Sequence, residues 1–130
     1  MSSPSELLLV EDDLLVARAL ERTLRARGAR VRHVACCTAA SLLTGPFSVG
    51  VFDIELPDGD GIELARLLRS RGVVGRIVFY TACTEPQRLA RARELGNVFV
   101  KSAQLPSLLE LSFRGPELEP RTGQTASAQG

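Results

Sequence analysis

The sequence has one histidine, three cysteines and no apolar run approaching the roughly 18 residues of a membrane span. The cysteine count is odd, two cysteines are adjacent and no Cys-x-x-Cys pair occurs, so the chain indicates neither a disulfide framework nor a zinc knuckle. With His33 as the single histidine, a zinc site would also run short of ligands. The first residues lack the basic segment of a secretion signal. We therefore expect a cytoplasmic protein that makes no contact with a membrane.

A strong net charge is also absent, because 16 basic and 15 acidic residues leave a formal net charge of +1. No global basic field favours nucleic acid, so we expect no nucleic-acid partner. At 130 residues, with 45% hydrophobic and 24% charged residues, the chain suits one soluble domain. Residues 114–130 contain one leucine and no aromatic residue. We expect a domain over residues 1–113, followed by a disordered tail over 114–130.

Short apolar runs alternate with amphipathic segments along the chain. The expected strands are 7–10, 31–35, 49–52, 77–80 and 98–100, and the expected helices lie between 13 and 28, at 38–43, after a turn at 57–59, at 86–95 and around 105–109. This alternation predicts βαβ units, and hence a parallel sheet with helices on both faces. We expect Asp13 and Asp60 to cap the helices that follow them, with Glu63 completing a capping box. The arginines of segment 86–95 are expected to form a solvated helix face.

Acidic residues follow two of the expected strands. Glu11, Asp12 and Asp13 follow the first strand, and Asp53 follows the third. If these strands are neighbours, their carboxylates meet at one edge, because sites in parallel sheets form at the carboxyl ends of the strands. Clustered carboxylates repel one another and need a cation, and a small set of hard oxygen ligands favours Mg²⁺. The sequence therefore predicts a magnesium site, with Asp13 interpreted as a helix cap rather than a ligand.

A carboxylate beside Mg²⁺ can attack a phosphorus centre and become an aspartyl phosphate. Thr81 ends the fourth expected strand and Lys101 the fifth, so a hydroxyl and an ammonium are available for the oxygens of the transferred group. Lys101 is the only lysine, and the other fifteen basic residues are arginines. This composition indicates that a compact point charge is needed at that strand end.

Several segments resemble the receiver domain of bacterial two-component response regulators, in the stand-alone form typified by single-domain chemotaxis regulators. The segments that carry the resemblance are Leu7-Leu8-Leu9-Val10-Glu11-Asp12-Asp13, Val51-Phe52-Asp53-Ile54-Glu55-Leu56-Pro57-Asp58-Gly59-Asp60-Gly61, Tyr80-Thr81-Ala82 and Val100-Lys101. They occur in the family's order, each at a strand end, within residues 6–113. The resemblance implies a flavodoxin-like α/β fold, with a doubly wound five-stranded parallel sheet in the order 2-1-3-4-5 and about five helices.

The resemblance also assigns roles to these positions. Asp53 matches the phospho-acceptor, Thr81 the switch hydroxyl and Lys101 the phosphate-binding lysine. Glu11 and Asp12 match the acidic pair of the magnesium site, with Asp12 as the more direct ligand. That site also includes Asp53 itself and the backbone carbonyl of Glu55.

These roles imply a phosphoryl acceptor rather than a turnover enzyme. A sensor histidine kinase or a phosphotransfer protein would phosphorylate Asp53 in an Mg²⁺-dependent reaction. The phosphoryl group would switch a docking surface on the fourth helix, fifth strand and fifth helix, which a downstream protein reads.

The chain departs from the family around its last strand. Ser102 stands where receivers usually have proline, and Val98 stands where they usually have the switch aromatic. Phe99 is offset by one residue and is expected on the other face of the sheet. These departures favour an alternative function, a protein-interaction module on the same fold that does not need phosphorylation.

Two further readings fit the residues less well. Asp53-Ile54-Glu55 has an acid two residues after the nucleophile, as in aspartyl-phosphate phosphohydrolases, but in that class the nucleophile follows the first strand. A calcium loop around Asp58-Gly59-Asp60-Gly61 would place leucines at two ligand positions, so that interpretation fails.

Overall fold

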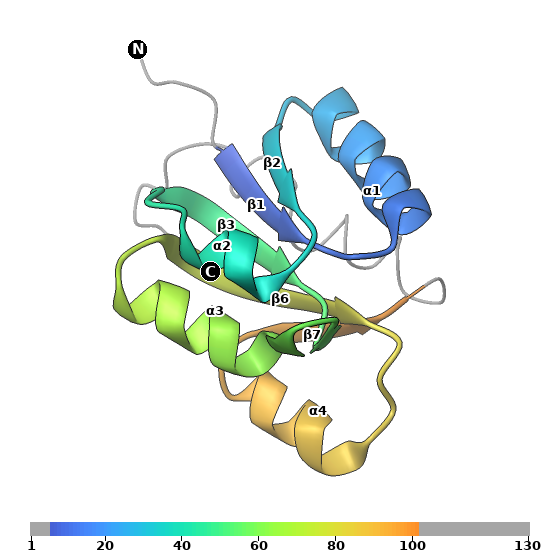
Figure 1. Cartoon of the computed structure of the whole chain (residues 1–130). Helices are drawn as coiled ribbons and strands as arrows, with labels where there is room; N and C mark the ends of the chain where they lie inside the picture. The colour runs from blue at the N-terminus through green and yellow to red at the C-terminus, as the bar shows by residue number, and fades with distance from the viewer. Residues whose placement is uncertain (1–5, 102–130) are drawn as a thin grey trace, which may run out of the picture.

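The computed structural model describes residues 6–101, which form a five-stranded parallel sheet with helices on both faces (Figure 1). The strands of this sheet are β1 (Glu6–Val10), β2 (Arg30–Val34), β3 (Phe47–Phe52), β6 (Val74–Thr81) and β7 (Asn97–Val100). The helices are α1 (Leu14–Ala26), α2 (Cys37–Ser41), α3 (Gly61–Ser70) and α4 (Pro86–Arg93). A separate antiparallel hairpin consists of β4 (Glu55–Leu56) and β5 (Gly59–Asp60).

The sheet has the order β2-β1-β3-β6-β7, and every neighbouring pair is parallel. This is the order 2-1-3-4-5 expected for the five main strands, so the doubly wound α/β fold is confirmed. Between residues 6 and 101 there are four helices, none of them long and apolar enough to cross a membrane. The helix expected around residues 105–109, the boundary at residue 113 and the expected tail lie outside the described residues.

The apolar run in β1 divides its side chains between two cores. Leu7 and Leu9 pack with the buried side of α1, whereas Leu8 and Val10 pack with residues of α2, α3 and α4. All four side chains are at most 1% exposed. Burying a side chain of this size stabilises the fold by about 1.5–3 kcal/mol relative to leaving it in water. A strand covered on both faces is therefore apolar at every position, as the sequence pattern indicates.

The connection from β3 to α3 is more structured than the turn expected at residues 57–59. The turn is present, but β4 and β5 pair on either side of it, and Leu56 is buried with 8% exposure. Gly61 then starts α3, and its N–H donates to the carbonyl oxygen of Ile54 at 2.7 Å. A Cβ atom at Gly61 would overlap the carbonyl oxygen of Asp53, so only glycine allows α3 to begin this close to the end of β3.

Candidate functional site

Four strands of the sheet end side by side, and each end carries a polar side chain. Glu11 follows β1, Asp53 follows β3, Thr81 ends β6 and Lys101 follows β7. The ladder of backbone hydrogen bonds continues into this edge, because the Asp53 N–H donates to Val10 O at 3.1 Å and the Lys101 N–H to Thr81 O at 2.9 Å. The regular backbone thus holds these side chains in place, as their positions after the strands predict.

Lys101 lies between two carboxylates. Its Nζ is 2.9 Å from Glu11 Oε1 and 2.9 Å from Asp53 Oδ2. The Glu11 and Asp53 side chains are only 2% and 8% exposed, so the ammonium supplies the positive charge that two buried anions require.

The second oxygen of Asp53 binds hydrogen-bond donors. Thr81 Oγ1 donates to Asp53 Oδ1 at 2.7 Å, and the Glu55 N–H donates to the same oxygen at 3.3 Å. The Thr81 hydroxyl oxygen in turn accepts from the Cys83 N–H at 3.1 Å. Both oxygens of the Asp53 carboxylate are therefore bound by groups that also suit an anionic ligand.

The electrostatics of the site follow from burial. Burial raises the pKa of the Glu11 carboxyl, because the charged form loses its hydration. Burial alone would lower the pKa of Lys101, but its hydrogen bonds to Glu11 and Asp53 outweigh this effect and raise the pKa above 10.5. The lysine is therefore charged throughout the neutral range.

The acidic residues are close enough together to hold a metal ion. Glu11, Asp12 and Asp53 offer carboxylate oxygens that all lie within 4.8 Å of one another, and Asp12 is exposed to solvent. Such a set of hard oxygen donors, open on one side to water, fits Mg²⁺. The Glu55 carboxylate is directed to Arg88 instead, with Oε2 at 3.3 Å from Nη1. Its side chain is therefore engaged elsewhere, which leaves the backbone carbonyl as the ligand expected from Glu55.

Comparison with known proteins decides the family. The family model of the response regulator receiver domain matches residues 7–111. The chain belongs to this family. Membership gives the receiver a role in two-component signalling, as a domain that accepts a phosphoryl group.

Two curated relatives are much longer than this receiver. It is 33% identical over 107 residues to the swarming motility regulation protein RssB of Serratia marcescens, which covers 79% of this chain and 49% of that protein. It is 37% identical over 78 residues to the response regulator protein PmrA of Pseudomonas aeruginosa, which covers 58% of this chain and 35% of that protein. The receiver thus spans half or less of each of these relatives.

Solved structures agree with this assignment. The non-phosphorylated HemR receiver domain of Leptospira biflexa is 31% identical, with a TM-score of 0.73 over 82% of this chain and 89% of that one. A receiver domain protein of Methanospirillum hungatei is 24% identical, with a TM-score of 0.71 over 83% of this chain and 90% of that one. The second match shows that the fold is shared.

The receiver places Val98 and Phe99 on opposite faces of β7, as the one-residue offset predicts. Phe99 is 6% exposed and packs in the cluster that contains the buried side of α1. Val98 packs against the opposite cluster, which includes residues of α3 and α4. The face that carries the switch aromatic in most receivers therefore has an aliphatic side chain here.

The caps expected from sequence are confirmed in part. Asp13 accepts from the N–H groups of Leu15 and Val16, and Asp60 accepts from the N–H of Ile62. Glu63, expected to complete a capping box, forms ion pairs with two arginines instead. The caps were predictable because they depend on residues two or three positions away.

Arg91 and Arg93 of α4 are exposed, as expected for a solvated face, whereas Arg88 is partly buried. Two of the three arginines, Arg88 and Arg91, also form ion pairs that were not expected. Arg91 Nη2 lies 2.7 Å from Glu63 Oε2 of α3. Arg88 lies within 4 Å of three carboxylates and is 26% exposed. These pairs join distant parts of the chain, so helical periodicity does not reveal them.

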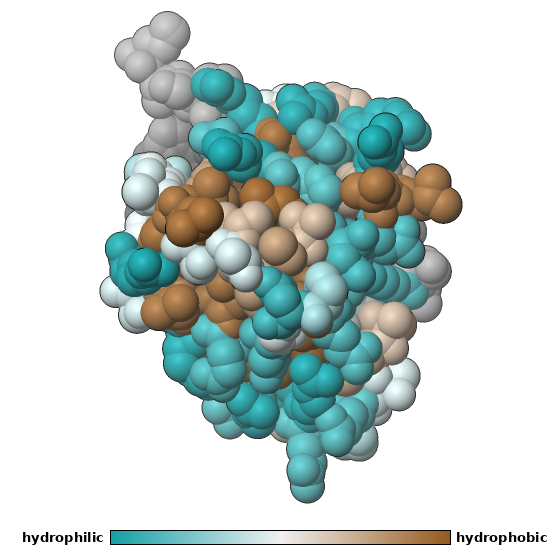
Figure 2. All heavy atoms as spheres, viewed as in Figure 1, coloured by the Kyte–Doolittle hydropathy of each residue, from teal (hydrophilic) through white to brown (hydrophobic). Residues whose placement is uncertain are grey.

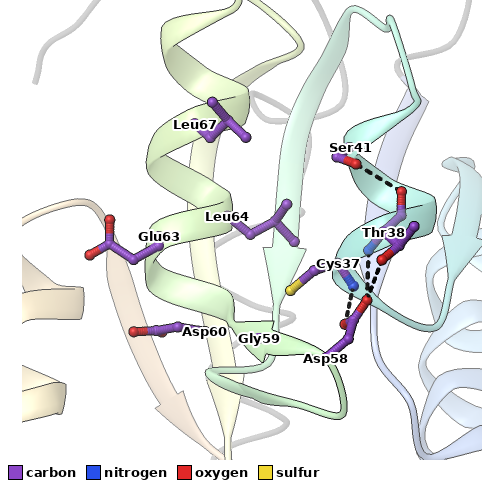
Figure 3. A pocket seen from close by; sticks show the side chains of 9 residues that line it. All are labelled: Cys37, Thr38, Ser41, Asp58, Gly59, Asp60, Glu63, Leu64 and Leu67. Carbon is purple, nitrogen blue, oxygen red and sulfur yellow. Dashed lines mark hydrogen bonds between the residues drawn. The ribbon is translucent and has the colours of Figure 1, made fainter.

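Asp58 has a role that its place in a turn did not suggest. Its carboxylate accepts from the N–H groups of Cys37 and Thr38 at 2.7 and 2.9 Å and from the Thr38 hydroxyl at 2.7 Å. Figure 3 shows this carboxylate turned toward the start of α2, at one end of a hollow between α2 and α3. The hollow has a volume of about 320 Å³ and is partly lined by Leu64 and Leu67. The β4–β5 hairpin therefore supplies the cap that Cys36, at the N-cap position, does not.

Among residues 6–101, large apolar side chains are exposed at the start of α1, around α2 and α3, and at Val100 of β7. Figure 2 shows hydrophobic surface where α1 begins and over α2 and α3. Leu14 and Leu15 in the first turn of α1 are 53% and 81% exposed, and Leu42, just after α2, is 78% exposed. Only the capping residue Asp13 separates the α1 leucines in the sequence from Glu11 and Asp12 of the site.

Proposed function

We propose that Asp53 accepts a phosphoryl group from a sensor histidine kinase or a phosphotransfer protein, in an Mg²⁺-dependent reaction. The observation that carries this proposal is the position of the Asp53 carboxylate between the Lys101 ammonium and the Thr81 hydroxyl. A phosphoryl group on Asp53 would have a cation and a hydroxyl donor close to its oxygens.

In the proposed step, a carboxylate oxygen of Asp53 attacks the phosphorus atom of a phosphohistidine. A P–O bond forms while the P–N bond breaks, and the electron pair of the P–N bond returns to the imidazole of the donor. Lys101 moves from the free carboxylate to the phosphoryl oxygens, and the Thr81 hydroxyl donates to another of them. The group stays on the protein until water hydrolyses it, so the chain is an acceptor and not a turnover enzyme.

We assign the magnesium ligands to the carboxylates of Glu11, Asp12 and Asp53 and to the backbone carbonyl of Glu55. When bound there, Mg²⁺ neutralises negative charge that develops on the transferred group. Asp12 is exposed, so a hydrated ion can reach this edge directly from solvent.

Two surfaces of the domain suit two kinds of partner. The exposed leucines of the first turn of α1 lie next to the acidic site and suit the phosphodonor protein, which must bring its histidine to Asp53. The output surface is assigned to α4, β7 and the helix expected around residues 105–109. A downstream protein would bind this surface with an affinity that depends on phosphorylation.

A second candidate function is a protein-interaction module that works without phosphorylation. The burial of Phe99 on the α1 side of the sheet favours it, because no aromatic ring of β7 faces α4 to change rotamer with Thr81. In that case a partner would bind equally well with and without a phosphoryl group on Asp53.

Intact-mass spectrometry after incubation with Mg²⁺ and acetyl phosphate tests the proposal. We expect one phosphoryl adduct on the wild type, none on Asp53→Ala, and an undiminished adduct on Asp13→Asn, which keeps a helix cap two residues from Glu11. Acetate is the leaving group in this version of the step. If a folded wild type that binds Mg²⁺ accepts no phosphoryl group from acetyl phosphate or a phosphohistidine protein, the interaction module replaces the acceptor.

A further inference from the structure

Arg88 is an unusual residue for the first turn of a helix. It is the third residue of α4, where the partial positive charge of the helix N-terminus disfavours a cation. Three carboxylates compensate: Arg88 nitrogens lie 3.3 Å from Glu55 Oε2, 3.5 Å from Asp60 Oδ1 and 3.9 Å from Glu85 Oε1. The side chain is only 26% exposed, so these contacts fix its direction toward the end of β3.

Two of the groups that Arg88 contacts belong to the residues directly after Asp53. Besides the Glu55 carboxylate, Arg88 Nη2 donates to the carbonyl oxygen of Ile54 at 3.5 Å. The Glu55 N–H donates in the opposite direction, to Asp53 Oδ1. The short segment of Ile54 and Glu55 is thus held by Arg88 on one side and by the Asp53 carboxylate on the other.

Glu55 presents an electrostatic difficulty for the proposed reaction. Glu11, Asp12 and Asp53 already place three carboxylates at this edge, against the single ammonium of Lys101. The Glu55 side chain is 60% exposed, and without Arg88 it would add a fourth carboxylate that has no cation of its own. That charge would repel any phosphodonor, because phosphodonors are anionic.

We propose that Arg88 is a positioning residue of the acidic site, which holds the Glu55 carboxylate toward α4 and cancels its charge, so that an anionic phosphodonor can approach Asp53. This inference rests on the proposed function for its phosphoryl-transfer part. Its effect on the metal site does not depend on phosphorylation, because the same uncompensated carboxylate that repels an anionic donor attracts Mg²⁺.

The first arm of the test measures the initial rate of adduct formation with acetyl phosphate at saturating Mg²⁺, using the full 130-residue chain. At an ionic strength of about 0.05 M we expect Arg88→Gln to slow the reaction about threefold, and the difference to shrink at about 0.5 M. The double variant Arg88→Gln/Glu55→Gln should react at the wild-type rate. Arg91→Gln is the matched control, because it removes the same charge from the same helix, but its partner Glu63 lies on α3 and keeps its ion pair with Arg66.

The second arm measures Mg²⁺ binding by titration calorimetry with magnesium chloride. Arg88→Gln should bind Mg²⁺ about threefold more tightly than the wild type, and the double variant should return to the wild-type affinity. If Arg88 only holds the segment of Ile54 and Glu55 in place, Arg88→Gln should slow phosphorylation and weaken Mg²⁺ binding together. Glu55→Gln should then restore neither. Either that pattern or an Arg88→Gln variant equal to the wild type in both arms overturns the proposal.

The two arms also separate this inference from the proposed function. A wild type that accepts no phosphoryl group contradicts the function, and the calorimetry alone then decides on Arg88. A phosphorylated wild type with an unaffected Arg88→Gln variant contradicts the role of Arg88 and leaves the acceptor assignment intact.

Discussion

At the scale of single residues, Lys101 is the cation that lets Glu11 and Asp53 lie close together. Its Nζ contacts both carboxylates, and its side chain is 15% exposed. Among the ion pairs of residues 6–101, it provides the only basic group paired with either of these two acids. Removing it would leave two mostly buried anions facing each other.

Lys101→Met retains the apolar stem and removes the charge. We expect the free energy of unfolding at pH 7 to fall by about 2 kcal/mol, and millimolar Mg²⁺ to restore part of the loss. The lysine pKa is raised, so in the wild type its contribution is complete below pH 10.5 and disappears as the pH rises through the folded-state pKa. Urea unfolding at pH 7 and at alkaline pH measures both effects.

Arg93→Met is the control for this prediction, because Arg93 is exposed on α4 and lies outside the site. It should change stability by less than about 0.5 kcal/mol. A Lys101→Met protein as stable as Arg93→Met at pH 7 would show that the site does not need the ammonium.

At the scale of elements, α2 depends on a residue from the β4–β5 hairpin. The helix has five residues, and its first N–H groups bind the Asp58 carboxylate. Hydrogen bonds from Thr38, followed by one from Cys37, hold the pKa of Asp58 well below its usual value of 3.8. A short helix cannot form alone, so this contact and the packing of Ala40 determine its position.

Asp58→Asn tests this connection through pH. Because the folded-state pKa is lowered, the carboxylate stabilises the fold above pH 3.8 and this contribution disappears as the pH falls below that value. We expect the wild type to lose stability more steeply than Asp58→Asn in this acidic range, as measured by urea unfolding at a series of pH values. Glu94→Gln, which removes an exposed carboxylate from the end of α4, should retain the wild-type slope.

Asp58 also affects a neighbouring thiol. Burial, followed by the charge of Asp58, raises the pKa of Cys37 to about 11. Asp58→Asn should therefore speed the alkylation of Cys37 at pH 9, since more of the thiol ionises. An unchanged alkylation rate would contradict the electrostatic contribution of Asp58.

Gly61 is the second element-scale feature that can be tested. In Gly61→Ala the new methyl group would collide with the backbone carbonyl of Asp53, which cannot move without disturbing the site. We expect a loss of about 1–3 kcal/mol in the free energy of unfolding and slower adduct formation. In Gly59→Ala the new Cβ would meet Cys37 Sγ at 3.0 Å, and a thiol can rotate away, so this variant should stay close to the wild type.

The sequence predicted the elements and the strand-end residues well, for a physical reason. An apolar run such as Leu7 to Val10 is a local pattern, and parallel strands bring their carboxyl ends to one edge whatever the details of packing. The sequence did not predict the contacts of Asp58 and Arg88, because each of these residues binds a segment more than 20 residues away. One indication was available: an arginine in the first turn of a helix opposes the helix dipole and requires acidic neighbours.

At the scale of the whole molecule, the exposed start of α1 follows the acidic site closely in the chain, with only Asp13 between Asp12 and Leu14. Leu15→Ser should leave stability unchanged, because the side chain is 81% exposed. We expect transfer from a phosphohistidine protein to slow about tenfold, since an apolar anchor at the contact is lost. Phosphorylation by acetyl phosphate should be unaffected, because it needs no protein contact.

Leu42→Ser is the matched control, with a leucine of similar exposure located after α2. It should leave both reactions at the wild-type rate. Equal slowing by the two variants would indicate a general loss of surface hydrophobicity, and no effect of Leu15→Ser would place the donor contact elsewhere.

Because the chain has a single lysine, NMR spectroscopy with lysine-selective labelling can monitor the site directly. Isotope labelling of lysine alone yields one backbone amide signal, because Lys101 is the only lysine in the chain. That amide donates to the Thr81 carbonyl, and the same residue's ammonium binds Glu11 and Asp53. The chemical shift of this single peak should therefore change on metal binding, on phosphorylation and on movement of the Thr81 hydroxyl. No tag or mutation is needed.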